Sequence, residues 1–111
     1  MKVQDRIILE RICKYAEQTL KFTAGSNLTE FSADEKTVSA CVFSLSQVGE
    51  MVNKLSEEFL QTNTSIPWHK IRGLRNRIVH DYDGIRLNTI WDVINDYLPE
   101  LIEVTKRLLK N

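Results

Sequence analysis

Apolar residues recur at three- and four-residue spacing along most of this chain, and that spacing places them on one face of an α-helix. The first such run begins at Gln4 or Asp5 and ends at Gly25, a residue type that commonly terminates helices. Its predicted inner face consists of Ile8, Ile12, Tyr15, Thr19 and Phe22.

A second run of apolar residues predicts one long helix. Ser32 and Glu35 have the spacing of a capping box, in which the two side chains satisfy free backbone N–H groups at a helix start. The stripe behind them continues for about six turns. It consists of Val38, Cys41, Val42, Leu45, Val48, Val52, Leu55 and Phe59. A stripe of this length is typical of a central helix that packs along one face.

The rest of the chain reads as further helices joined by short loops. Residues 62–65 form a predicted loop, and Pro67 suits the first turn of the next helix. Asn88 can cap another helix, and Pro99 marks a kink or a fresh start before the last one. No segment shows sustained strand alternation. The pattern therefore predicts an all-α chain, an up-and-down bundle of about five helices in a single domain over residues 1–111.

Gly49 and Glu50 interrupt the long apolar stripe. A glycine inside a helix costs about 1 kcal/mol relative to alanine, and the close approach of a neighbouring helix could offset that cost. Glu50 brings a charge into an otherwise apolar stretch. We expect it to pair with an arginine, and a structural role is favoured over a catalytic one.

The charge of the chain is balanced overall but not locally. The chain has fifteen basic and fifteen acidic side chains, and this neutral total is mild evidence against a nucleic-acid partner. Residues 67–80, however, contain no Asp or Glu and four cations: Lys70, Arg72, Arg75 and Arg77. Such a segment can attract a phosphate backbone and hold individual phosphates by paired guanidinium hydrogen bonds.

Other features exclude several classes of protein. Cys13 and Cys41 lie in helical apolar patterns and lack metal-type spacing, so we expect buried thiols in a reducing compartment. No apolar run is long enough to span a bilayer, and the N-terminus does not lead into a signal peptide. These features predict a cytoplasmic protein without a metal or cofactor. Because a small domain buries little surface, a homodimer is plausible.

His80 adds chemistry to the basic segment. Histidine titrates near neutrality, so beside an arginine it can deprotonate a ribose 2′-hydroxyl or protonate a leaving oxygen. The guanidinium would stabilise the pentavalent phosphate. Asn76 and His80 stand four residues apart and share a helix face, whereas Arg75 lies roughly 100° around from Asn76. Arg77, three residues before His80, is an equally good partner by angle, so spacing does not choose between the two arginines.

Residues 75–82 resemble the Arg-x-x-x-x-His-x-Tyr signature of HepT-type HEPN ribonucleases, with an asparagine directly after the arginine. The resemblance extends to Gly49-Glu50, to Ile66-Pro67-Trp68 and to Trp91, in the same order, across roughly residues 4 to 109. It implies a HEPN-like helical bundle that forms a two-fold homodimer, with the two motifs lining one cleft.

The resemblance also implies roles for individual residues. Arg75 and His80 correspond to the catalytic pair, Asn76 to a supporting polar residue, and Tyr82 to a tyrosine that a partner nucleotidyltransferase can modify with AMP. The expected protein is a metal-independent endoribonuclease toxin, neutralised by an MntA-like antitoxin. Arg72, Arg77 and Lys70 are the candidate phosphate-binding residues.

Two other functions stay open from the residues alone. HEPN-type bundles also resemble the helical substrate-binding part of nucleotidyltransferases, so the chain could be the non-catalytic subunit of a two-chain transferase. It could also be a plain helical dimerisation domain in which the basic segment is incidental. A neighbouring gene for a small nucleotidyltransferase would disfavour the dimerisation domain, and toxicity that depends on His80 would separate a nuclease from a passive subunit.

Overall fold

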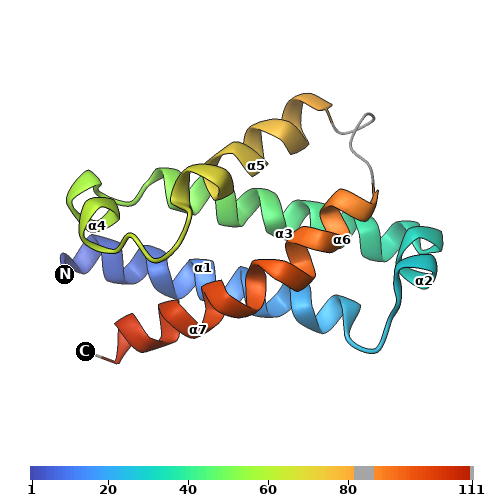
Figure 1. Cartoon of the computed structure of the whole chain (residues 1–111), viewed down its shortest axis with the longest axis horizontal. Coiled ribbons are helices and arrows are strands. Elements are labelled where there is room, and N and C mark those ends of the chain that lie inside the picture. The colour runs from blue at the N-terminus through green and yellow to red at the C-terminus, as the bar shows by residue number, and fades with distance from the viewer. Residues whose placement is uncertain (82–86, 111) are drawn as a thin grey trace.

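The computed structural model describes residues 1–81 and 87–110, except the side chains of Leu74 and of residues 77–81. Every regular element within these ranges is an α-helix, which confirms the predicted all-α class. Figure 1 shows the helices in chain order: α1 (Val3–Thr23), α2 (Leu28–Ala33), α3 (Glu35–Asn53), α4 (Glu57–Thr62), α5 (Trp68–Asp81), α6 (Leu87–Asp96) and α7 (Leu98–Leu109).

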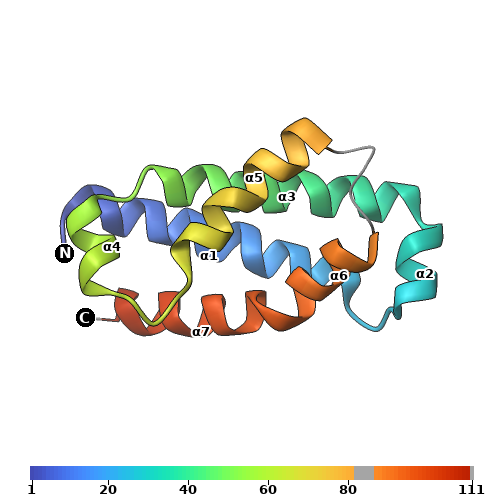
Figure 2. The ribbon, with the colours of Figure 1, turned by 45° about the horizontal axis from the view of Figure 1, so that its top comes forward.

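The longer helices pack as an up-and-down bundle about 41 Å long. α1 and α3 run antiparallel along the long axis, α7 lies against α1, and α5 crosses α3 (Figure 2). α6 leads almost directly into α7, so the pair returns along the bundle as one broken rod. The core fills the space between these helices, and its fully buried side chains include Leu9, Ile12, Leu45, Val48, Val52, Ile90, Ile94, Leu98 and Leu101. The five predicted helices correspond to α1, α3, α5, α6 and α7.

The start of α3 differs from the predicted capping box. Asp34, not Ser32, caps this helix, and its carboxylate accepts a hydrogen bond from the Thr37 backbone N–H at 3.1 Å. The same carboxylate accepts a second hydrogen bond from the Thr37 hydroxyl at 2.6 Å. The prediction for Ser32 and Glu35 was therefore wrong, because Ser32 is occupied inside a separate short helix, α2.

α2 was not predicted, and a capping box is found at its start, formed by Asn27 and Glu30. The Asn27 side chain accepts from the Glu30 N–H at 2.8 Å, and the Glu30 carboxylate accepts from the Asn27 N–H at 3.1 Å. This short helix places Phe31 in the core, where the centroid of its ring lies 5.1 Å from the centroid of the Trp91 ring. Burial of one aromatic ring therefore stabilises a helix too short to show periodicity.

The long predicted helix also ends earlier than expected. α3 stops at Asn53, so Leu55 and Phe59 belong to the following turn and to α4 rather than to the α3 stripe. Both side chains are still buried, which explains why the apolar pattern continued across the break. Periodicity alone does not detect such a break when the chain turns and buries its next apolar residues in the same core.

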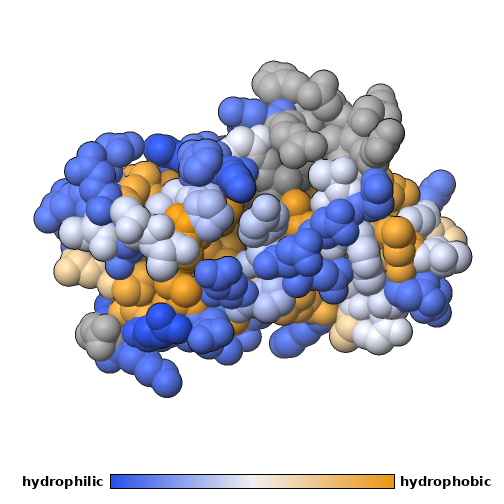
Figure 3. All heavy atoms as spheres, viewed as in Figure 1, coloured by the Kyte–Doolittle hydropathy of each residue, from blue (hydrophilic) through white to orange (hydrophobic). Residues whose placement is uncertain are grey.

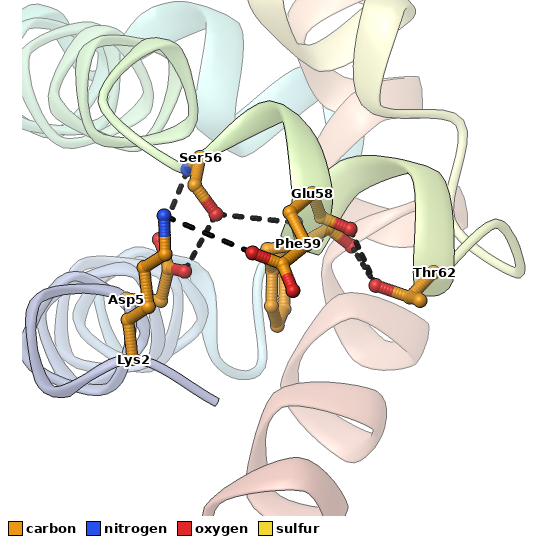
Figure 4. A network of polar contacts seen from close by, with 6 residues as sticks. All are labelled: Lys2, Asp5, Ser56, Glu58, Phe59 and Thr62. Carbon is orange, nitrogen blue, oxygen red and sulfur yellow. Dashed lines mark hydrogen bonds and ion pairs between the residues drawn. The ribbon is translucent and has the colours of Figure 1, made fainter.

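Asp5 on α1 holds the turn between α3 and α4 in place through hydrogen bonds to Ser56. Its buried carboxylate accepts hydrogen bonds from the Ser56 backbone N–H at 2.9 Å and from the Ser56 hydroxyl at 2.7 Å (Figure 4). The Ser56 oxygen in turn accepts from the Phe59 N–H at 3.1 Å and caps α4. An exposed ion pair between Lys2 and Glu58 spans the same two segments at 3.8 Å.

The remaining helix starts are close to their predicted positions. α5 begins at Trp68, and the Pro67 carbonyl accepts from the N–H groups of the first turn, as predicted for a proline at a helix start. Pro99 lies in the first turn of α7, where its missing N–H costs nothing. Asn88 lies inside α6, which already begins at Leu87, so the prediction that Asn88 caps this helix was wrong. Within the described ranges, no helix is long and apolar enough to cross a membrane.

The Asp5–Ser56 contact gives a first prediction. Asp5→Ala leaves the partly buried Ser56 N–H without its charged acceptor and removes the anchor of α4, so we expect a loss of about 1–3 kcal/mol in the free energy of unfolding. Urea denaturation followed by circular dichroism measures this loss. Glu10→Ala, at an exposed position on the same helix, is the control and should change stability by less than about 0.5 kcal/mol. Equal stability of the two variants would contradict the proposed anchoring.

Candidate active site

Gly49 determines how closely α5 lies on α3. A Cβ added at Gly49 would lie 2.6 Å from the Arg75 Cβ and 3.2 Å from both the Arg75 nitrogen and the Ile71 carbonyl oxygen. Two of these three atoms are backbone, so a side chain at this position would push the helices apart. The predicted close approach of a neighbouring helix is therefore confirmed, and its partner is the segment of α5 that carries Arg75.

The same crossing places Arg75 beside Glu50. The Arg75 Nε lies 3.0 Å from the Glu50 Oε2, and the Arg75 Nη1 donates a long hydrogen bond of 3.4 Å to the Asn76 Oδ1. The predicted pairing of Glu50 with an arginine is confirmed, and the structure identifies which arginine it is. Arg75 and Asn76, two of the three predicted catalytic residues, are thus in contact.

This ion pair orients a side chain more than it stabilises the fold. The Arg75 and Glu50 side chains are 37% and 38% exposed, and exposed pairs contribute only about 0–1 kcal/mol to stability. Its main effect is to fix the plane of the guanidinium group through Nε. Among the described residues, the polar partners of Arg75 are Glu50 at Nε and Asn76 at Nη1, which leaves Nη2 able to donate to a bound phosphate.

Arg72 is held on the same side of α5 by a second set of partners. Its Nε donates to the Asn53 Oδ1 at 3.2 Å, and its Nη2 lies 3.5 Å from the Glu57 Oε1. Neither Asn53 nor Glu57 was predicted as a partner of α5, because the apolar pattern extended the long helix through both positions and gave no sign of the turn that presents Glu57 to α5. Arg72 and Arg75 thus form a short row along one flank of α5, each paired with a carboxylate from α3 or α4.

Lys70 lies on the opposite flank of α5. It is exposed and lines a hollow between α5 and the α6–α7 pair, away from Glu50. The candidate phosphate-binding residues are therefore divided between two flanks of one helix. Within residues 1–81 and 87–110, no group of three or more His, Cys, Asp or Glu side chains is arranged to hold a metal ion.

Comparison with known proteins bears on what this arrangement does. The chain matches the family described as "Ribonuclease HepT-like" over residues 12–108. It is 32% identical over 105 residues to a protein named as a candidate RNase from Caldanaerobacter subterraneus subsp. tengcongensis, and the match covers 95% of this chain and 94% of that protein. This chain belongs to the HepT-like ribonuclease family.

Two further proteins are similar to this HepT-like chain over most of its length. A protein named as a candidate RNase from Methanocaldococcus jannaschii is 31% identical over 96% of this chain and 88% of its own length. A protein named as a probable ribonuclease HepT from Thermococcus cleftensis is 26% identical over 99% of this chain and all of its own length. No solved structure matches the chain. The family is one of ribonucleases, and membership supports an RNA-cleaving function for this chain.

Not every predicted site residue of the HepT-like chain falls within the described structure. His80 and Arg77 belong to the helical span of α5, but their side chains lie outside the described residues. Tyr82 lies outside them entirely. The assignments of His80 and Tyr82, and the choice between Arg75 and Arg77, therefore stay predictions.

The two cysteines of the HepT-like chain are buried free thiols, as predicted. Burial raises the pKa of Cys41 to about 11, and repulsion from Asp34 acts in the same direction. Burial also raises the pKa of Cys13, whose thiol donates a hydrogen bond to the Glu17 carboxylate at 3.1 Å. Because the thiolate is the nucleophilic form, both groups are structural near neutral pH.

Gly49 yields a prediction about the candidate site. Gly49→Ala gains helix propensity but forces its methyl group into the α5 backbone, so we expect a net loss of about 1–3 kcal/mol in the free energy of unfolding. RNA cleavage should fall as well, because α5 must move away from Glu50. Ser39→Ala, at an exposed position on the same helix, is the matched control and should affect neither property. A stabilised, fully active Gly49→Ala protein would contradict the close packing.

Proposed function

We propose that this chain is a metal-independent endoribonuclease that cleaves RNA with Arg75 and His80, acts as a two-fold homodimer, and is the toxin of a toxin–antitoxin pair. The observation that carries the proposal is the guanidinium group of Arg75, oriented by Glu50 at 3.0 Å on a helix whose segment 67–80 has no acidic residue. Membership of the HepT-like family supports RNA as the substrate.

The proposed reaction needs only groups that this chain carries. His80 takes the proton from a ribose 2′-hydroxyl, or gives one to the leaving 5′-oxygen, as the 2′-oxygen attacks the adjacent phosphorus. Charge accumulates on the phosphate oxygens during that attack, and the Arg75 guanidinium stabilises it. Asn76 supports Arg75 through its Oδ1 atom. Because Glu50 already holds Nε, little reorganisation of the arginine is needed when the phosphate arrives.

Binding of the RNA backbone would use the other cations of α5. Arg72 is half-buried against Asn53 and Glu57, which limits its movement. Lys70 is exposed and able to follow a backbone that passes along the other flank of the helix. With Arg77, these residues give α5 a local positive charge in a chain of zero net charge. We therefore expect RNA binding to weaken steeply as the salt concentration rises.

Substitutions at the proposed catalytic pair test this function. His80→Ala should lower the cleavage rate about 100-fold or more, the usual scale for losing a general acid or base, and should abolish growth inhibition. Arg75→Ala should cost about 2 kcal/mol or more in transition-state stabilisation. Arg77→Ala is the matched control on the same helix and should lose less. Cleavage of a labelled RNA by purified protein, with and without EDTA, measures all three.

Each outcome of this experiment is informative about a different part of the proposal. A folded His80→Ala protein with full activity would overturn the nuclease mechanism. Equal losses in Arg75→Ala and Arg77→Ala would overturn the assignment of the arginine and leave the mechanism standing. Inhibition by EDTA would contradict metal independence. No cleavage by the wild type, combined with support of a partner transferase, would favour the non-catalytic subunit.

Regulation would act on Tyr82, two residues beyond His80. An MntA-like nucleotidyltransferase antitoxin would attach AMP to the tyrosine hydroxyl. The added phosphate and nucleoside would bring negative charge and bulk next to the position of the RNA phosphate. This placement rests on the signature in residues 75–82. Modification would silence the enzyme without unfolding it.

Tyr82→Phe separates modification from simple binding. The variant loses only the hydroxyl that accepts AMP, so we expect it to keep most of its cleavage activity and to escape neutralisation by the cognate transferase. Growth during co-expression reports the escape, and the intact mass of the wild type reports the added adenylate. A variant that is still neutralised, or a wild type without such a mass increase, would show that inhibition works by direct binding.

A further inference from the structure

Phe43 on α3 is the most exposed aromatic side chain among the described residues, with 57% of its surface accessible. The centroid of its ring lies 6.5 Å from the centroid of the Tyr15 ring on α1, and the two planes meet at 79°. An edge-to-face pair of this kind is a favourable aromatic contact, and it can cover at most one face of the Phe43 ring. The ring is therefore held in place by a neighbour and still open to a flat partner from outside.

The side chains one turn away from Phe43 on α3 are small or polar. Ser39 and Ala40 lie one turn before it, and Ser46 and Gln47 lie one turn after it. The Ser46 hydroxyl is turned back to its own helix, where it donates to the Phe43 carbonyl at 2.7 Å. On α3 the ring therefore rises from a polar surface and not from an extended apolar one. A protein partner would find little apolar area there, whereas a nucleobase needs only the ring.

α1 adds cations beside this aromatic pair. The Lys14 Nζ lies 5.9 Å from the centroid of the Tyr15 ring, and Arg11, one turn before Tyr15, is exposed. Glu17 is turned away towards α7, where its Oε2 lies 3.2 Å from the Lys106 Nζ. Sites for single-stranded nucleic acid combine these two features, because cations hold the phosphates and aromatic rings stack on the bases.

Phe43 lies on the same side of α3 as Glu50, which holds the Nε of Arg75 at 3.0 Å. Glu50 follows Phe43 by seven residues, which is two helical turns and about 10 Å along the helix axis. The nucleotides of a stacked strand rise about 3.4 Å each, so about three of them cover this length. A strand whose phosphate binds Arg75 can therefore place a base on Phe43 a few nucleotides away.

The opposite flank of α5 is less suited to a continuing strand. In the face drawn in Figure 3, apolar surface is visible between α5 and the α6–α7 pair, bordered by hydrophilic side chains. Residues 87–105, which form α6 and the first part of α7, contain four Asp or Glu and no Lys or Arg. Their carboxylates repel phosphate. The charges therefore favour a strand that leaves Arg75 along α3 and α1.

We propose that Phe43 stacks on an unpaired base of the substrate, which is single-stranded RNA, while Lys14 and Arg11 contact neighbouring phosphates. This inference rests on the proposed ribonuclease function and names the substrate class of the same site. The bases of a duplex are already stacked on one another, whereas the bases of loops and single strands can turn onto an aromatic ring. Every base has a π-face, so the contact selects unpaired bases and not a particular sequence.

Binding of a short, fluorescein-labelled oligoadenylate tests this contact without cleavage, because 2′-O-methyl groups block the hydroxyls that would attack the phosphates. Phe43→Ala should weaken binding about 5- to 100-fold by fluorescence anisotropy, the usual range for the loss of one stacked base. Phe43→Trp should keep the affinity. Phe43→Leu should lose most of it, because leucine is apolar but has no aromatic face. Tyr97→Ala removes an exposed ring between the acidic helices α6 and α7, and this matched control should bind like the wild type.

A strand of the same length and backbone but without bases separates stacking from a structural role of the ring. Phe43→Ala should bind this abasic strand as well as the wild type does, because no base is present to stack. An equal loss on both strands would overturn the proposal, and so would normal binding of oligoadenylate by Phe43→Ala or Phe43→Leu. A Phe43→Ala protein that sediments as a smaller species than the wild type would also overturn it, because this face would then belong to a contact between copies.

Circular dichroism establishes that each variant is folded before its binding is compared, and the outcomes distinguish this inference from the proposed function. A wild type that binds oligoadenylate through Phe43 but does not cleave unmodified RNA would overturn the nuclease and support the stacking contact. A wild type that cleaves RNA no better than Phe43→Ala does, and binds it no more tightly, would overturn the stacking contact and support the nuclease. A wild type that binds no single-stranded RNA would overturn both.

Discussion

The contact between α3 and α5 at Gly49 is the constraint on which the candidate site depends. It leaves no room for a Cβ, with the Arg75 Cβ only 2.6 Å from where one would lie. That closeness brings Glu50, the next residue along α3, within 3.0 Å of the Arg75 Nε. A larger residue would separate the helices and the ion pair together. Gly49 and Glu50 therefore act together: the glycine allows α5 to lie close to α3, and the glutamate forms the ion pair with Arg75 that this closeness permits.

The second organising principle is segregation of charge in a chain that is neutral overall. The four Lys and Arg side chains of residues 67–80 lie on α5, while the carboxylates that pair with two of them come from α3 and α4. Glu50 and Glu57 lower the net charge along one flank but hold two arginines in defined positions. A fully uncompensated basic helix would attract phosphate more strongly yet present it with mobile side chains. Position rather than total charge is what a phosphate transition state requires.

Periodicity predicted the long helices because each buries a continuous face, and it failed where burial came from tertiary contacts. α2 depends on the capping pair Asn27 and Glu30 and on one buried ring, Phe31. The break after α3 depends on Asp5, fifty-one residues away from Ser56 in sequence. No local pattern contains that information, since the apolar residues on either side of the break are buried alike.

The sequence predicted some contacts of the candidate site and left others open. Glu50 could be expected to bind an arginine, because a lone carboxylate on an apolar face needs a partner. Helix spacing could not say which arginine of the basic segment it would be, because nothing in the sequence fixes how that helix lies on α3. The crossing at Gly49 answers that question for the ion pair, because a helix that touches α3 at residues 71 and 75 presents Arg75 to Glu50. The arginine singled out by the family signature is thus the one that the backbone geometry holds in a fixed orientation.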